Sequence, residues 1–145
     1  MAQAPDTSIL ADFLVEAGEL LAALGDQLIA LEAAPRDPAL LNAVFRAFHT
    51  VKGGAGFLAV EPMVALCHRA EDLLNDARAG RLLLDADTID ALLAALDQLQ
   101  TMMRALGAGT PPAPAPAGLL QRLTSAPAAL APAPAPVAAA PRPAP

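Results

Sequence analysis

The chain has 145 residues, with 9 basic against 15 acidic side chains and a formal net charge of −6 at pH 7, and this length suits one domain with a tail. With one lysine and neither Trp nor Tyr, the chain lacks the basic and aromatic surface of a nucleic-acid-binding protein. The single cysteine, Cys67, excludes an intrachain disulfide framework and a multi-cysteine zinc site, and it fits a reducing compartment, so we expect a cytoplasmic location.

Neither a targeting signal nor a membrane-spanning signal is expected. The N-terminal segment has no basic region ahead of its apolar residues, as a signal peptide requires. No proline-free apolar run approaches the roughly 20 residues that cross a bilayer, so we expect no membrane insertion.

Residues 7–58 predict two helices. The first spans residues 7–33, because apolar side chains recur every three or four positions, and Asp6 or Thr7 can accept its first free N–H groups. The second starts at Pro38, which suits the first helical position, after Asp37 as a favourable N-cap. The stripes expected to be buried are Leu10, Phe13, Ala17, Leu20, Leu24, Leu28 and Leu31, then Leu41, Val44, Phe48, Val51, Ala55 and Leu58.

Two further helices are predicted before residue 109. The third begins at Glu61 and Pro62 and is stopped by Gly80, and the fourth follows Asp85 or Asp87 and ends at Gly107. Their inner faces are expected to carry Leu66, Ala70, Leu73, Leu74 and Ala77, then Ile89, Leu92, Leu96, Leu99, Met103 and Leu106. No stretch alternates apolar and polar residues for long, so no sheet is expected. Connections of roughly 3–8 residues between long helices predict an all-α, up-down-up-down antiparallel four-helix bundle, which we expect to be monomeric.

The composition changes abruptly near Gly109. Residues 111–145 hold eleven of the fifteen prolines but only two charged side chains, Arg122 and Arg142. We therefore predict a bundle domain over 1–109 and a Pro/Ala-rich linker over 110–145, extended and semi-rigid, with a short helix at 118–124 resting on the bundle. Because the chain stops within low-complexity sequence, we expect a longer protein to continue beyond it.

The window of residues 45–58 departs from the composition of an ordinary helix. It contains three glycines, each of which costs about 1 kcal/mol relative to Ala inside a helix. At 100° per residue, His49, Lys52 and Gly53 fall on one face beside the buried stripe. A glycine one turn after a histidine leaves the imidazole uncovered, and the lysine can stabilise an anion attached to it.

Two polar residues of the third helix complete a candidate site. His68 and Glu71 are three positions apart and share a face. If the second and third helices pack antiparallel, Glu71 can accept a hydrogen bond from one ring nitrogen of His49 and leave the other as a nucleophile. Taken singly, each of these residues would more often be an ordinary surface group, and only their combined spacing favours a site.

Other chemistries fit less well. A metal site from His49, His68 and Glu71 is less favoured, because a di-iron bundle needs paired Glu-x-x-His motifs and many inward carboxylates. A dinucleotide-type glycine pattern at residues 54–59 follows a helix rather than a strand and is set aside. Cys67 is interpreted as a small core residue.

The segment Phe-Arg-Ala-Phe-His-Thr-Val-Lys-Gly-Gly-Ala-Gly at 45–56 resembles the signature of histidine phosphotransfer (HPt) domains, and more narrowly the N-terminal phosphotransfer domain of CheA-type chemotaxis kinases. The resemblance extends over residues 8–107, although Phe48 replaces an Ala common in the family. It implies that His49 is the phosphoacceptor and that Glu71 bonds to its ring. It also implies that Lys52 and His68 form the phosphate environment.

The resemblance also implies the partners. The phosphoryl group comes from ATP and Mg on a separate kinase domain and goes to an aspartate of a CheY-type response regulator that holds its own Mg, so this domain needs no cofactor and is not an enzyme on its own. Phe45 lies one turn before His49, at the margin between exposed and buried sides, and is interpreted either as part of the docking surface, with Gly53 permitting close approach, or as core. The alternative function is a docking or dimerisation bundle without phosphotransfer.

Overall fold

The computed structural model describes the backbone of residues 7–130 and the side chains of residues 9–124. It contains five helices and, within residues 7–130, no strand: α1 Thr7–Ala33, α2 Pro38–Phe57, α3 Glu61–Arg78, α4 Ala86–Gly107 and α5 Ala117–Leu130. The all-α prediction is confirmed. Asp6 and the segment 131–145, for which a capping role and an extended tail were predicted, lie outside the described residues.

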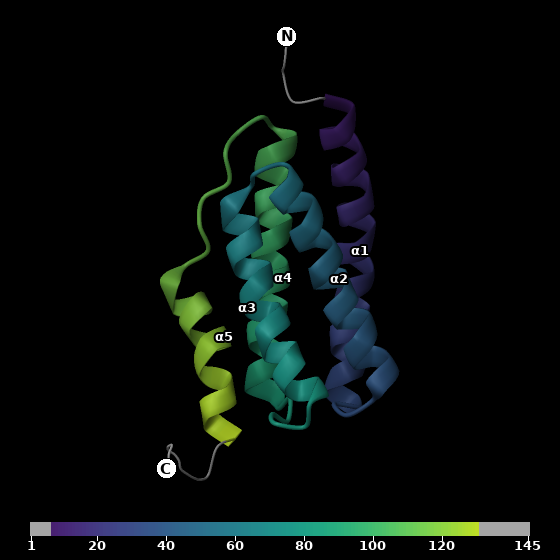
Figure 1. Ribbon diagram of the computed structural model, residues 1–145, viewed down its shortest axis with the longest axis vertical. Coiled ribbons are helices and arrows are strands. Elements are labelled where there is room, and N and C mark those ends of the chain that lie inside the picture. Colours follow the sequence, from purple (N-terminus) through teal and green to yellow (C-terminus); the bar gives the residue numbers. More distant parts are fainter. Residues whose placement is uncertain (1–6, 131–145) are drawn as a thin grey trace.

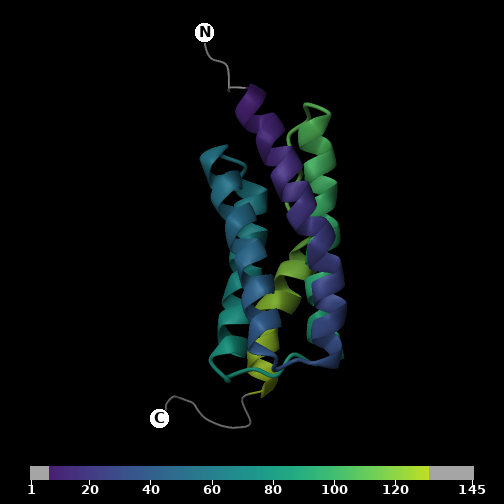
Figure 2. The ribbon, with the colours of Figure 1, turned by 90° about the vertical axis from the view of Figure 1, so that its right-hand side faces the viewer.

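Helices α1 to α4 form the predicted up-down-up-down bundle (Figure 1). Each helix contacts its neighbour in the chain, and α1 contacts α4 to close the ring. Seen from the side, α2 and α3 form one half of the bundle and α1 and α4 the other (Figure 2). No helix in the described part of the chain is long and apolar enough to cross a membrane.

Local capping sets the starts of α2 and α4. The Asp37 carboxylate accepts the N–H groups of Ala39 and Leu40 at 2.9 and 3.3 Å, and Pro38 occupies the first turn as predicted. For the N-cap of α4 the sequence left Asp85 and Asp87 as candidates, and the structure shows that Asp85 is the cap. It accepts both the N–H and the hydroxyl of Thr88, at 2.9 and 2.8 Å. These hydrogen bonds stabilise the ionised form and lower the pKa of Asp85.

The ends of α3 and α4 share one geometry. Gly80 and Gly109 have φ values of 79° and 77°, the left-handed conformation that terminates a helix. After α4, the Gly109 N–H bonds to the Leu106 carbonyl and the Thr110 N–H to the Ala105 carbonyl, at 3.0 and 2.8 Å. The expectation for Gly80 is confirmed, and α4 ends at Gly107 as predicted. The left-handed residue after α4 is Gly109, two positions beyond that last helical residue.

Most of the predicted apolar stripes are buried in one core. Phe13, Leu24, Phe48, Leu66 and Leu92 are at most 8% exposed. Six residues of these stripes are only partly buried: Leu10, Leu20, Leu58, Ala77, Met103 and Leu106. At two of these places the adjacent residue, Leu21 or Met102, is the buried one. Adjacent residues lie 100° apart around a helix. Because Leu20 and Leu21 are the same residue type, as are Met102 and Met103, residue type does not decide which of each pair faces the core.

The fifth helix packs against α3 and α4 (Figure 1). Ala115, Leu119 and Leu123 are buried, and the Arg69 guanidinium of α3 donates to the carbonyl of Leu120 at 3.2 Å and to the hydroxyl of Thr124. A helix was predicted only at 118–124, and α5 is longer, Ala117–Leu130. The chain therefore stays packed on the bundle beyond residue 109, where α4 has ended.

Candidate functional site

The site is organised around the contact between His49 of α2 and Glu71 of α3. His49 Nδ1 lies 3.1 Å from Glu71 Oε2. A carboxylate oxygen only accepts, so the Nδ1 atom carries a hydrogen, and in the neutral ring Nε2 then keeps its lone pair. The imidazole is 64% exposed while the Glu71 side chain is 7% exposed. The pair thus presents a nucleophilic nitrogen to solvent and keeps its partner carboxylate inside.

Lys52 forms a hydrogen bond with the second oxygen of the Glu71 carboxylate. Its Nζ donates to Glu71 Oε1 at 2.7 Å, and the Lys52 side chain is 25% exposed. A buried carboxylate without partners is strongly destabilising. With His49 on one oxygen and Lys52 on the other, Glu71 has a charge-assisted donor on each, and a positive charge lies beside the exposed imidazole.

His68 does not join these three residues. Its Nε2 lies 3.7 Å from Asp72 Oδ1, and both side chains are more than 60% exposed. Among the described residues, no hydrogen bond or ion pair connects His68 to His49, Lys52 or Glu71. The role predicted for His68 stays a prediction.

Phe45 lies between the core and the site. Its ring is partly buried against the core, and it stacks on the His49 imidazole with centroids 6.0 Å apart and planes inclined by 9°. The Arg78 guanidinium lies over the Phe45 ring, with Cζ 4.4 Å from the centroid.

Sequence reasoning missed Arg78, although a signal was present. Arg78 follows Glu71 by seven positions, which is two turns along the same face of α3. Once Glu71 faces His49 across antiparallel helices, that face brings residue 78 beside the turn of α2 that precedes His49.

The three glycines of α2 differ in their surroundings. A Cβ at Gly54 would meet Phe13 ring atoms at 2.6 Å, so Gly54 permits the close packing of α1 on α2. At Gly53 a Cβ would meet nothing within 4 Å, and the residue is exposed. A Cβ at Gly56 would lie 3.9 Å from a methyl group of Val64, which is an ordinary van der Waals contact. Packing inside this chain therefore explains Gly54 and not Gly53.

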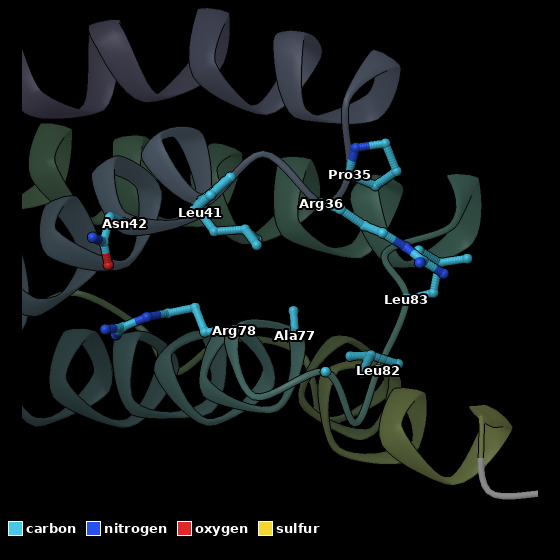
Figure 3. A pocket seen from close by; sticks show the side chains of 10 residues that line it. Pro35, Arg36, Leu41, Asn42, Ala77, Arg78, Leu82 and Leu83 are labelled. Carbon is cyan, nitrogen blue, oxygen red and sulfur yellow. The ribbon is translucent and has the colours of Figure 1, made fainter.

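A cavity of about 590 Å³ opens at the end of the bundle, between the α1–α2 and α3–α4 connections (Figure 3). Its lining includes Leu41 and Leu82 with the guanidinium groups of Arg36 and Arg78. Arg78 therefore belongs both to this cavity and to the stack on Phe45. Within the described residues, no three His, Cys, Asp or Glu side chains are placed to hold a metal ion.

Cys67 is a core residue, as expected. It is fully buried one turn before Glu71 on α3. Burial raises the pKa of its thiol from 9.0 to about 12; the Glu71 charge adds to this shift and Lys52 opposes it.

Comparison with known proteins matches the region of the chain that contains His49, Lys52 and Glu71. The Hpt domain family model matches residues 8–106. Sensor histidine kinase CheAY of Helicobacter pylori is 40% identical over 95 residues, which cover 66% of this chain and 12% of that protein. Chemotaxis protein CheA of Treponema pallidum is 31% identical over 122 residues, covering 84% of this chain and 15% of that protein. The chain thus spans a small part of the length of these relatives.

Solved structures give the same result at the level of the fold. The solution structure of the histidine phosphotransfer domain of CheA superposes with a TM-score of 0.75 at 31% identity, covering 83% of this chain and 92% of that one. The phosphorylated P1 domain of CheA3, solved in complex with CheY6 from R. sphaeroides, gives a TM-score of 0.74 at 27% identity, covering 86% and 98%. Family model, relatives and fold agree, and the chain belongs to the Hpt domain family.

Proposed function

We propose that this domain is a phosphocarrier of a chemotaxis two-component system. His49 takes a phosphoryl group from ATP bound to a CheA-type kinase domain and passes it to an aspartate of a CheY-type response regulator. The observation that carries the proposal is the exposed His49 imidazole whose Nδ1 is held by the buried Glu71, with Lys52 on the same carboxylate. The family relationship supports it, since relatives over this region are CheA proteins.

The hydrogen bond pattern fits both transfers. In the first, a bond forms between His49 Nε2 and the γ-phosphorus while the bond to the β,γ-bridging oxygen breaks, and ADP leaves with that electron pair. The hydrogen stays on Nδ1, so the ring becomes positive and its bond to Glu71 strengthens. In the second, an aspartate oxygen of the regulator bonds to phosphorus, the N–P bond breaks, and its electron pair returns to Nε2.

The polar residues around His49 have different parts in this proposal. Glu71 orients the ring and balances its charge, whereas Lys52 places an ammonium group beside the position of the phosphoryl oxygens. His68 contributes to the phosphate environment only if its imidazole leaves Asp72. Mg and ATP belong to the kinase domain, and a second Mg belongs to the regulator. The single free cysteine fits a reducing compartment, so the proposed location of the reaction is the cytoplasm.

Docking of the regulator is proposed on the surface around His49. Gly53 is exposed and fills no space inside the chain, so its missing side chain leaves room for a partner. Phe45 adds a partly exposed aromatic edge beside His49. The domain is acidic, as is a regulator's aspartate pocket, and charge repulsion between them is screened over about 8 Å at physiological salt. Apolar contact therefore provides the attraction, and affinities on the order of micromolar or weaker suit a transient relay.

The function is tested by incubating the domain with a CheA kinase domain and Mg-ATP. We expect an acid-labile, base-stable label on His49, no label on His49→Gln, and transfer of the label to a CheY-type regulator. The chain alone with Mg-ATP should stay unlabelled. A domain that binds these partners yet never carries phosphate would instead support the docking-bundle alternative.

A further inference from the structure

We propose that Arg78 is a positioning residue for the phosphoacceptor, and that it acts on His49 through the ring of Phe45. The inference rests on the proposed function, since it concerns the reactivity of His49. It also predicts a property of the unphosphorylated domain, the orientation of the His49 ring.

The His49 ring needs a second constraint. Its side chain is 64% exposed, and its hydrogen bond to Glu71 fixes only the Nδ1 atom. A ring held by its bond to Cβ and by one hydrogen bond can still tilt about the line through these two attachments and move Nε2 away from an incoming phosphorus. The Phe45 ring, inclined by only 9° to the imidazole at a centroid distance of 6.0 Å, limits this tilt on one side. That separation is within the range of offset stacking.

Phe45 in turn is held by Arg78. Phe45 is only partly buried, so core packing restrains one part of the ring and leaves another accessible. The Arg78 guanidinium covers the ring with Cζ 4.4 Å from its centroid, a close cation–π contact. Figure 3 shows the Arg78 side chain lying opposite Asn42, in the space between α2 and α3. The contact therefore joins the end of α3 to the turn of α2 that precedes His49.

The guanidinium of Arg78 is committed to this contact. Within the described residues it forms no ion pair, and its one hydrogen bond, to the Asn75 amide oxygen, is long at 3.5 Å. Arg81, three residues later, differs in this respect. Its guanidinium donates to the Asp76 carboxylate at 2.8 Å, and within the described residues the cation over the Phe45 ring is Arg78 and not Arg81. Two exposed arginines at one end of the bundle thus provide a matched comparison.

The test compares Arg78→Met with Arg81→Met, which remove the same charge from the same end of the bundle. The readout is the initial rate of His49 phosphorylation by phosphoramidate, which needs no kinase, and then by a CheA kinase domain with Mg-ATP. An exposed cation–π contact corresponds to roughly a two- to fivefold change in rate. We expect Arg78→Met to be slower by that factor, Arg78→Lys to recover part of the loss, and Arg81→Met to match the wild type. Melting temperatures identify any variant that slows through partial unfolding.

The route through Phe45 is tested by repeating Arg78→Met in a Phe45→Leu background. We expect no further loss of rate there, because the intermediary ring is gone. An undiminished loss would instead make Arg78 a direct contact of the phosphoryl donor and overturn the positioning role. Wild-type rates for Arg78→Met, or equal slowing by Arg81→Met, would also overturn it.

A measurement without phosphorylation separates this inference from the proposed function. We expect the ¹⁵N spectrum of the His49 ring to show a less populated Nδ1–H tautomer in Arg78→Met than in the wild type or Arg81→Met. An unchanged spectrum contradicts the positioning role. If the wild-type chain takes no label from any donor, the proposed function fails, and this spectrum still decides whether Arg78 positions the ring.

Discussion

At the scale of single residues, the site depends on how many hydrogen bonds the buried Glu71 carboxylate can accept. Glu71 has two oxygens, and His49 occupies one while Lys52 occupies the other. Neither donor has to give way, so the imidazole and the ammonium group are both fixed. The same residue affects its neighbour in the core, because the Glu71 charge contributes to raising the pKa of the Cys67 thiol.

Replacing Glu71 with Gln tests this division. An amide has one acceptor oxygen, so His49 and Lys52 must compete for it, and the charge that balances the phosphorylated ring is lost. We expect phosphorylation of His49 to slow by about tenfold or more with the helical fold retained, as judged by initial rates and circular dichroism. Glu61→Gln, the same change at an exposed position of α3, is the control and should keep the wild-type rate. An unchanged rate for Glu71→Gln would reduce Glu71 to a structural residue.

Cys67 provides a second prediction at this scale. With its pKa raised to about 12, the thiolate fraction at pH 8 is on the order of one in ten thousand, and the thiol is also fully buried. We expect no reaction with a thiol reagent such as DTNB in the native protein and stoichiometric reaction after unfolding in guanidinium. Rapid labelling of the native protein would mean that this part of α3 opens readily.

At the scale of the helices, neighbouring glycines of α2 have opposite surroundings. Ala at position 53 meets open space, whereas Ala at position 54 collides with Phe13 of α1. The structure therefore assigns Gly54 to helix packing and leaves Gly53 without a role inside the chain. Another small residue, Ala59, ends α2 at a φ of 61°, a conformation that costs a residue with a Cβ about 1–2 kcal/mol.

The pair Gly53→Ala and Gly54→Ala tests this distinction. We expect Gly53→Ala to stabilise the fold by up to about 1 kcal/mol, because Ala favours the helix. Gly54→Ala should be less stable than Gly53→Ala by about 1–3 kcal/mol, because the Phe13 ring must move. Urea unfolding measures both. If Gly53 leaves room for the regulator, Gly53→Ala also slows transfer from phosphorylated His49, and normal transfer would contradict its docking role.

At the scale of the whole molecule, the fifth helix extends the packed part of the chain beyond the four-helix bundle. Ala115, Leu119 and Leu123 are buried against it, and Arg69 of α3 fixes the backbone of α5 at Leu120. The division at residue 109, predicted from composition, stays a prediction. A proline-rich segment of this kind can carry residues that complete the core.

Leu123→Ala tests whether α5 belongs to the folding unit. Leu123 is 1% exposed, and truncation of such a side chain costs about 2–5 kcal/mol. We expect that loss in urea unfolding, with phosphorylation of His49 unchanged below the transition, because α5 contacts α3 and α4 and makes no contact with α2. The exposed Arg122→Ala is the control. A Leu123→Ala variant as stable as the wild type would show that the bundle folds independently of α5.

Much of this protein could be predicted from short-range sequence features. Helix starts follow from Asp37 and Pro38, and the end of α3 follows from Gly80, because the groups that satisfy a helix end lie within a few residues of it. The same holds for the four amphipathic stripes, since helical periodicity is local. The pairing of His49 with Glu71 was also foreseen, once antiparallel packing of the second and third helices was assumed.

Tertiary structure decided which helix faces pack against each other and at what axial position along the helices. It brought Arg78 onto the ring of Phe45 and left His68 paired with Asp72. It also placed Gly54, but not Gly53, against another helix. These outcomes depend on the axial register and rotation of α2 against α1 and α3, and side-chain packing across the whole core determines both. The sequence by itself determined the helices and most of their buried faces, and it indicated His49 as the candidate nucleophile. The register between helices determined which side chains lie beside His49.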